Sequence, residues 1–507
     1  MKKNYALIIF APLTLTLSLS SCNFTFPSSN TSGSITTSTS PWDSEQTSAI
    51  QGDGYYKPAS TLYSYNDVVQ KSPYPIDSVV SVGEQNILVI PIKISGTANA
   101  TSANRTKIEK AFFGAEDDTG WQSLRTYFYN SSYGKLIVNG VVSNWYDCGY
   151  TRSQLSTDTN MGTLVDAAVA WYKSSTSTNC SNFDVDKNGW IDCVCLIYSD
   201  STHTQTEYNQ NKTNLWAYTY WQQNNNASVS SPMANTYMWA SYDFMNETNF
   251  IDIDAHTYIH EFGHCMGLDD YYNYDDNSSY AAAGGFDMQD LNVGDHNPFS
   301  KMALGWITPY VVTDSTSLTI RPTATSGDVI LLNPTWNGSA FDEYILMELY
   351  SPDGMNRFDA EHQTYSGYPK GPTSYGVRMY HIDSRLYKES ASGHDLDYIG
   401  YADSMSSGYY YEVAATNTTS GSEYATEIYA AKDFKQVHMI SASGTNTVAT
   451  GSFLTNADLF SGSKTFSMNS FKSFFVHSGK FNDNTTMSYA ISFSSASAAG
   501  VTITFSK

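Results

Sequence analysis

The chain has 507 residues and a formal net charge of −22, with 27 Lys and Arg against 49 Asp and Glu. That length is sufficient for two or three domains with hydrophobic cores. The acidic balance disfavours nucleic-acid binding, which requires a basic surface.

The N-terminus has the pattern of a secretory signal. A basic start is followed by an apolar run at 5–19 and then by Ser20-Ser21-Cys22. This order is typical of a signal peptide and is too short for a spanning helix. We expect residues 1–21 to be removed and Cys22 to be lipid-modified, as in a bacterial lipobox; an ordinary cleaved signal is the alternative. Residues 22–80 begin with a Ser, Thr and Asn-rich stretch, so we expect a tether and lead-in there.

A folded domain is expected from residue 81. The run NILVIPIKI at 86–94 is nearly continuous in apolar residues, as a buried strand would be. The other elements expected here are helices at 106–113, 120–129 and 161–172, and strands with loops at 136–142, 214–221 and 236–245.

The segment DVDKNGWID at 184–192 is a candidate cation site. Asp184, Asp186, Asn188 and Asp192 place oxygens at positions one, three, five and nine around a glycine, as a calcium loop does. A full EF-hand is excluded, because its twelfth position is Cys195 rather than Glu. The alternative is an Asx-rich turn that needs no ion.

The segment HEFGHCMGLDD at 260–270 predicts a catalytic zinc site. His260 and His264 are four residues apart, so they lie on one face of a helix and can reach one metal ion. Glu261 is placed to accept a proton from water. His256 is expected to hydrogen bond at the start of the helix, since a fourth ligand would close the site.

The residues after the second histidine bring the chain back to the metal. Gly267 can end the helix in the left-handed conformation that glycine adopts easily. Either Asp269 or Asp270 then becomes an oxygen ligand. Three protein ligands and one open position are typical of catalytic zinc.

The stretch HEFGHCMGLDDYY resembles the immune inhibitor A-type metallopeptidases, which are secreted bacterial zinc endopeptidases related to the metzincins. The resemblance implies that Asp270, at the position of the third metzincin histidine, is the third ligand. Asp269 remains the alternative, because the family more often has proline there. Met288 resembles the metzincin Met-turn, an apolar floor beneath the metal, but Asp290 stands where that pattern often supplies a tyrosine.

From about residue 313 the pattern changes to short alternating strands. We therefore expect an α+β chain with a metzincin-like zinc-protease domain at 81–312 and a β-rich, sandwich-like domain at 313–507. The alternative for the second domain is a sheet built against the first. Strands are expected at 318–321, 329–332, 344–349 and 376–382, with the last two within 480–505. The odd number of cysteines after Cys22 argues against a disulfide scaffold, although Cys148 and Cys180 could form a bridge.

These observations favour a surface-anchored zinc-dependent endopeptidase that hydrolyses peptide bonds of extracellular proteins, with Glu261 as the general base. The alternatives are a catalytically inactive metalloprotease-fold lipoprotein that binds peptides or glycans, and a zinc hydrolase that acts on a non-peptide bond. The expected cofactors are Zn²⁺ and, at residues 184–192, Ca²⁺. We expect a monomer at the extracellular face of the cell membrane, or secreted, with protein or peptide substrates and no nucleic acid.

Overall fold

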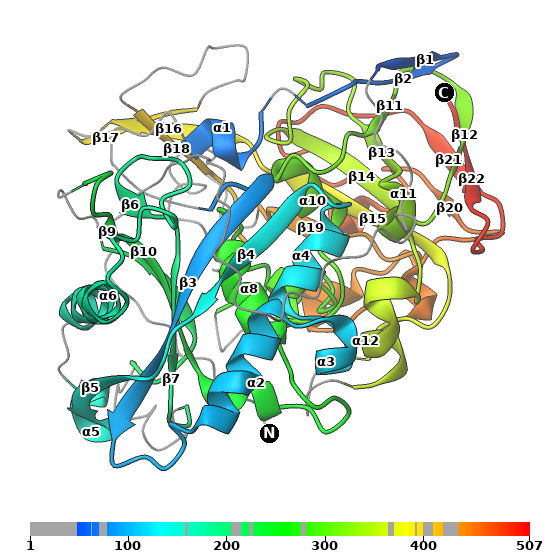
Figure 1. The fold of residues 1–507 in the computed structure, drawn as a ribbon. Helices are drawn as coiled ribbons and strands as arrows, with labels where there is room; N and C mark the ends of the chain where they lie inside the picture. The colour runs from blue at the N-terminus through cyan, green and yellow to red at the C-terminus, as the bar shows by residue number, and fades with distance from the viewer. Residues whose placement is uncertain are drawn as a thin grey trace.

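A computed structural model describes residues 48–61, 63–69, 79–157, 161–202, 204, 214–222, 227–274, 280–363, 370–390, 393–398, 409–418 and 434–507. The predicted signal peptide and Cys22 lie outside these residues. The described part of the chain is mixed α and β, with 11 α-helices and several sheets (Figure 1), which agrees with the expected α+β class at that level. None of its helices is long and apolar enough to cross a membrane.

The first half is built on a six-stranded sheet. The order is β4-β3-β7-β10-β8, and β5 pairs with β3. All neighbours are parallel except β8, which runs antiparallel to β10 and ends the sheet. Its strands are β3 (Gly83–Ser95), β4 (Leu136–Val142), β5 (Tyr146–Thr151), β7 (Val194–Tyr198), β8 (Tyr218–Trp221) and β10 (Thr236–Ser241).

Helices cover both faces of this sheet. The side chains of a strand alternate between the two faces, and those of β3 are apolar on both, so each face is buried. Ile87 and Val89 pack on the side of α2 (Ser102–Phe113), α4 (Leu124–Ser131) and α8 (His256–His264). Leu88 and Ile90 pack on the other side, with α6 (Met161–Thr176) (Figure 1). Helix α4 begins later than predicted because the Ser123 hydroxyl accepts a hydrogen bond from the Thr126 N–H and caps it there.

The second half contains a seven-stranded sheet with the order β1-β2-β11-β13-β14-β15-β19, and a four-stranded sheet with the order β12-β22-β21-β20. Ile345 and Met347 of the larger sheet pack with Ile503 and Phe505 of the smaller one, so the two sheets form a sandwich. The strands of the larger sheet are β1 (Ile50–Gly52), β2 (Tyr55–Lys57), β11 (Tyr310–Val312), β13 (Val329–Leu332), β14 (Glu343–Tyr350), β15 (Gly376–Asp383) and β19 (Val437–Met439). Those of the smaller sheet are β12 (Thr316–Ile320), β20 (Thr465–Phe466), β21 (Ala490–Phe493) and β22 (Val501–Ser506).

The other face of the seven-stranded sheet packs against the first half. Leu346 and Tyr380 belong to the same hydrophobic cluster as Ile259 and Phe262 of α8. The expected domains at 81–312 and 313–507 therefore share one core. Strand β2, from the segment predicted as lead-in, pairs with β11 and joins the second half as well.

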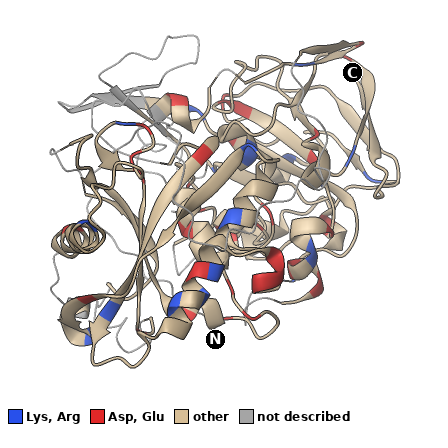
Figure 2. Ribbon diagram, viewed as in Figure 1, with Lys and Arg blue, Asp and Glu red and all other residues tan. Residues whose placement is uncertain are grey.

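Acidic residues are spread over both halves of the fold (Figure 2), and the described cysteines form no disulfide. Figure 2 shows Asp and Glu over both halves, with α3 (Glu116–Thr119) acidic along most of its length. The cysteines of the described residues are free, so the bridge considered between Cys148 and Cys180 is absent. Cys193 and Cys265 are buried with their Sγ atoms 3.4 Å apart, which places them in the apolar layer between β7 and α8.

Candidate metal centre

Helix α8 presents the first two candidate ligands from a buried position. Its residues from His256 to Gly263 are all buried. The helix ends at His264, and the chain reverses at Gly267, whose φ of 100° lies in the left-handed region, as predicted. A Cβ at Gly267 would also lie 3.1 Å from the Tyr65 ring, so both the backbone and the packing favour glycine there.

His256 does not belong to the cluster formed by the other two histidines. Its Nδ1 lies 2.6 Å from the Asp254 carboxylate, its Nε2 lies 3.2 Å from Asp359, and the Trp121 ring stacks on it. Burial alone would lower the pKa of His256, but Asp359 and Asp254 outweigh it and raise the pKa to about 10. The protonated imidazole donates to both carboxylates and holds the start of α8.

His260, His264 and Asp270 converge at the end of α8. The two Nε2 atoms are 3.1 Å apart, and Asp270 Oδ1 lies 2.9 Å from His260 Nε2 and 3.3 Å from His264 Nε2. In a tetrahedral zinc site with bonds of about 2.05 Å, two ligand atoms are about 3.3 Å apart. The three separations are close to that value, so the side chains need little movement to share one ion.

Backbone carbonyls orient both imidazoles toward this point. His260 Nδ1 faces the Met288 carbonyl and His264 Nδ1 faces the Leu268 carbonyl, each at 2.7 Å. A carbonyl can only accept, so each Nδ1 carries a hydrogen and each Nε2 of a neutral ring presents a lone pair. Asp270 Oδ1 is buried beside them without a well-formed hydrogen bond. Two lone pairs and a carboxylate oxygen repel one another unless a cation lies between them, so this donor set fits zinc.

The same group binds a proton when no cation is present. Burial would lower the pKa of His264, but Asp270 raises it to about 10. Burial would likewise raise the pKa of Asp270, but His264 and His260 hold it well below its ordinary value. A cation in this position takes the place of the proton, so binding would release it.

Asp269 is in a different environment from Asp270. Burial raises the pKa of Asp269 to about 6, and the neighbouring Gln436 amide partly opposes this shift. Its charge also acts on the buried Tyr65 hydroxyl. Of the two aspartates considered as third ligand, the structure brings only Asp270 to the histidines.

Glu261 is buried beside the cluster and is 6% exposed. The hydroxyl of Thr219, on β8, donates to the Glu261 carbonyl (2.8 Å) and lies 3.3 Å from its Oε2. Burial raises the pKa of Glu261, although His264 and His260 oppose the shift. A carboxylate with a raised pKa is a stronger base, which suits proton transfer near neutral pH. Thr219 was not predicted, since only the strand around it leaves a signal in the sequence.

Two tyrosines beside the cluster were also not predicted. The Tyr274 hydroxyl donates to Asp270 Oδ2, leaving Oδ1 directed at the histidines. The Tyr272 ring lies 6.4 Å from the His260 ring. Burial raises the pKa of both hydroxyls well above their ordinary value, so they remain protonated donors. Their only sequence signal is their position within four residues after Asp270.

The Met288 turn lies against α8. Met288 is fully buried and its carbonyl accepts from His260, while the Gln289 amide donates to the His260 carbonyl (3.3 Å). Asp290 accepts from the Gly285 N–H (2.7 Å), and burial raises its pKa to about 7. The turn therefore orients the first histidine through its backbone, and Asp290 braces the turn itself.

The 184–192 loop gathers three carboxylates. Asp184, Asp186 and Asp192 each offer an oxygen within 4.8 Å of the others. Asp184 is 1% exposed, and its Oδ1 has no hydrogen-bond partner among the described residues. Asn188, the fourth predicted ligand, directs its Oδ1 to the Trp190 N–H (2.9 Å). Burial raises the pKa of Asp184, a cost that a hard cation in the loop would remove.

Comparison with known proteins adds no assignment to this site. No protein-family model matches the chain, and no curated protein matches it significantly.

Proposed function

We propose that this chain is a zinc-dependent endopeptidase. The observation that carries the proposal is the convergence of His260, His264 and Asp270 around a point that no fourth described protein ligand shares, with Glu261 beside it. The resemblance of HEFGHCMGLDDYY to the immune inhibitor A-type metallopeptidases supports it. In this proposal residues 81–312 are a metzincin-like peptidase domain and residues 313–507 a β-rich C-terminal domain.

In the proposed hydrolysis, each residue around the cluster has a separate role. A zinc ion held there supplies Lewis acidity, which lowers the pKa of water from about 15.7 to about 7 and polarises a carbonyl group. Glu261 takes a proton from the attacking water and passes it to the leaving amine. Thr219 holds the Glu261 carboxylate in position, and Tyr274 orients Asp270.

The end strand of the sheet favours an extended peptide as substrate. Within the described residues, no further strand pairs with β8 on its outer edge. A peptide can add to such an edge through backbone hydrogen bonds. Since Thr219 of β8 contacts Glu261, a peptide bound along this edge would pass the catalytic carboxylate.

Substitution of Glu261 tests the proposal. Glu261→Gln keeps the shape of the side chain but removes the base, so we expect casein digestion to fall at least about 100-fold, in line with the loss of a general base, while zinc content stays the same. Glu109→Gln, on the exposed face of α2, is the matched control and should digest casein normally. Chelation should stop digestion and added zinc should restore it. Full activity of Glu261→Gln, or indifference to chelation, would refute the mechanism.

The alternative is an inactive metalloprotease-fold lipoprotein that binds peptides or glycans. The retained glutamate argues against it, because a decayed site would most readily lose the base. Protein digestion that depends on both Glu261 and zinc separates the two.

We also propose that a lipid on Cys22 anchors the protein to the extracellular face of the membrane. The signal-like N-terminus and the position of Cys22 support this. Cys22→Ser should release the protein into the medium, as measured by cell fractionation. Retention of this variant in the membrane fraction would contradict the anchor.

Finally, we propose that the 184–192 loop binds Ca²⁺. The three clustered carboxylates support a hard cation, which prefers oxygen ligands, and so does Asp184 Oδ1, which has no hydrogen-bond partner in the described part of the chain.

A further inference from the structure

The segment between β2 and β3, which was expected as a lead-in, packs against the turn at the end of α8. It contains the short helix α1 (Tyr65–Val69) and continues directly into β3 (Figure 1). Tyr65 and Val79 are buried in the same hydrophobic cluster as Cys265 and Leu268 of the turn. Nothing in the proposed mechanism uses this segment.

The turn at 265–268 decides where two candidate ligands point. The Leu268 carbonyl accepts from His264 Nδ1 (2.7 Å), and Asp270 follows two residues later. Gly267 reverses the chain between them in the left-handed conformation. A small rotation of this turn would therefore move an imidazole and a carboxylate together.

Two contacts from the segment act directly on the turn. The Val79 N–H donates to the carbonyl of Cys265 (2.8 Å), the residue that ends α8. Carbonyl groups in the last turn of a helix have no partner within the helix, so Val79 supplies one. The Tyr65 ring lies against Gly267, where an added Cβ would come within 3.1 Å of it. One contact therefore holds the backbone before the reversal, and the other fills the space at the reversal itself.

The Tyr65 hydroxyl reaches the residue next to the third candidate ligand. Burial raises the pKa of Tyr65 well above its ordinary value, and the charge of Asp269 adds to the shift, whereas the Gln436 amide opposes it. The same amide opposes the effect of burial on the pKa of Asp269. These three groups therefore lie together, with Asp269 on the side of Tyr65 and Asp270 on the side of the histidines.

The segment is itself fixed to parts of the fold that carry no candidate ligand. Asn66 Nδ2 donates to Ser81 Oγ (2.8 Å), which joins α1 to the residues before β3. The Ser81 carbonyl accepts from Trp306 Nε1 (2.7 Å). The Tyr65 ring meets the Phe341 ring edge to face, with centroids 5.0 Å apart. The segment therefore has a fixed position from which to hold the turn.

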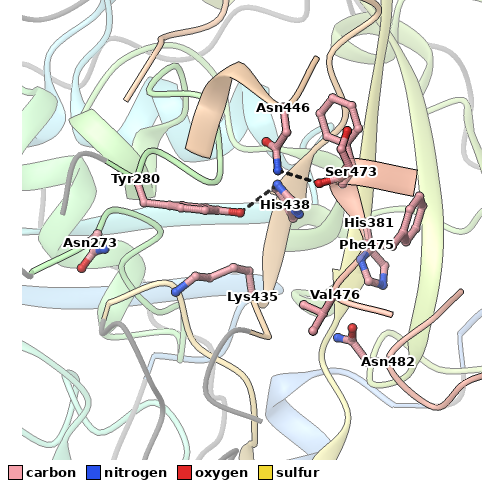
Figure 3. A pocket seen from close by; sticks show the side chains of 11 residues that line it. Asn273, Tyr280, His381, Lys435, His438, Asn446, Ser473, Phe475, Val476 and Asn482 are labelled. Atoms are coloured by element: carbon pink, nitrogen blue, oxygen red, sulfur yellow. Dashed lines mark hydrogen bonds between the residues drawn. The ribbon is translucent and has the colours of Figure 1, made fainter. Parts of the chain in front are cut away.

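Open space lies beside the chain that follows the turn. Asn273, three residues after Asp270, lines a cavity of about 290 Å³ together with Tyr280, Lys435 and His438 (Figure 3). The chain beyond Asp270 is not enclosed on this side, so the contacts from α1 contribute more to its position.

We propose that Tyr65, together with the backbone of Val79, is a positioning residue of the metal centre: it holds the turn that directs His264 and Asp270 to one point. The inference rests on the zinc site of the proposed function. It gives the segment on the side of the proposed lipid anchor a part in the chemistry, so this segment is more than a tether.

Substitutions in α1 test this role. Tyr65→Ala should weaken zinc binding about tenfold, the lower end of the cost of losing a group that orients a metal ligand. It should also change the visible absorption spectrum of the cobalt-loaded protein, because cobalt reports the ligand geometry that zinc, a d¹⁰ ion, does not. Tyr65→Phe keeps the ring against Gly267 and should retain most of the affinity.

Val68→Ala is the matched control. It also truncates a buried side chain of α1, three residues along the chain, and should lower the melting temperature of the metal-free protein as Tyr65→Ala does. Zinc affinity, measured by competition with a fluorescent chelator, and the cobalt spectrum should both be unchanged in Val68→Ala. A loss confined to Tyr65→Ala is then not a general loosening of the fold.

The outcomes separate this role from the proposed function. Unchanged zinc affinity and cobalt spectrum in a folded Tyr65→Ala protein would overturn the positioning role, and so would equal losses in Val68→Ala. If Tyr65→Ala does not fold, Tyr65→Leu, which keeps apolar volume without the ring, is judged by the same two measurements. A protein that binds zinc but digests no casein would contradict the peptidase and leave the positioning role standing. If the unsubstituted protein binds no zinc, both are overturned.

Discussion

Replacing Asp270 with asparagine is expected to remove most of the affinity for zinc, whereas the same replacement at Asp269 is not. The two residues are adjacent, Asp270 buried and Asp269 half-buried, and each substitution removes one carboxylate without changing the shape of the side chain. Only Asp270 places an oxygen within 3.3 Å of both candidate histidine ligands. Comparison of Asp270→Asn with Asp269→Asn therefore distinguishes the effect of losing a metal ligand from the effect of losing a nearby charge.

The size of the effect follows from these contacts. Substituting a group that merely orients a metal ligand costs about 10- to 100-fold in affinity. Loss of the ligand itself should cost more, so we expect at least about a 100-fold weaker zinc complex for Asp270→Asn, or about 2.7 kcal/mol. Asp269→Asn changes only a charge at a distance, and its effect should stay below about tenfold.

Competition with a fluorescent zinc chelator measures both variants against the unsubstituted protein. Circular dichroism checks that each variant is folded, so that lost affinity is not mistaken for lost structure. If Asp269→Asn loses zinc and Asp270→Asn retains it, the two aspartates have been assigned the wrong way round. If neither loses zinc, the cluster is not the metal site.

Two further predictions concern stability. Asp359 and Asp254 raise the pKa of His256 to about 10, against about 6.5 in the unfolded chain. The charged form of His256 should therefore stabilise the fold fully below pH 6.5, and this stabilisation, about 5 kcal/mol, should be lost as the pH rises through 10. Chemical denaturation at both ends of this range should show the loss in the unsubstituted protein but not in His256→Gln. If the 184–192 loop binds Ca²⁺, the ion should raise the melting temperature and Asp184→Asn should abolish that increase; an equal calcium effect in both proteins would place the ion elsewhere.

The parts of the site that were predicted are those carried by local spacing. The four-residue interval between His260 and His264 fixes their common face, and Gly267 marks the reversal that returns Asp270. The sequence could not distinguish Asp269 from Asp270 as the third ligand, because both lie in the returning segment. Only the tertiary structure shows which of the two carboxylates is directed at the histidines.

Contacts across long sequence separations left no such signal. Thr219 reaches Glu261 because β8 ends the sheet beside α8, and Asp359 reaches His256 from the far side of the helix. Strand alternation predicted that the second half is rich in β-strands, arranged as a sandwich or as a sheet built against the first half. It did not predict which face of β14 and β15 would meet α8, since both faces of these strands are apolar.

Tyr380 and Leu346, on the second half's central strands, stand in direct apolar continuity with the helix that presents the histidines. The sandwich therefore packs directly against the half that carries the two histidines, and the two halves are not independent folding units. The two halves should therefore unfold in one cooperative thermal transition. A substitution that weakens the packing of Leu346 or Tyr380 should also make the His260 and His264 side chains more mobile, although it changes no candidate ligand.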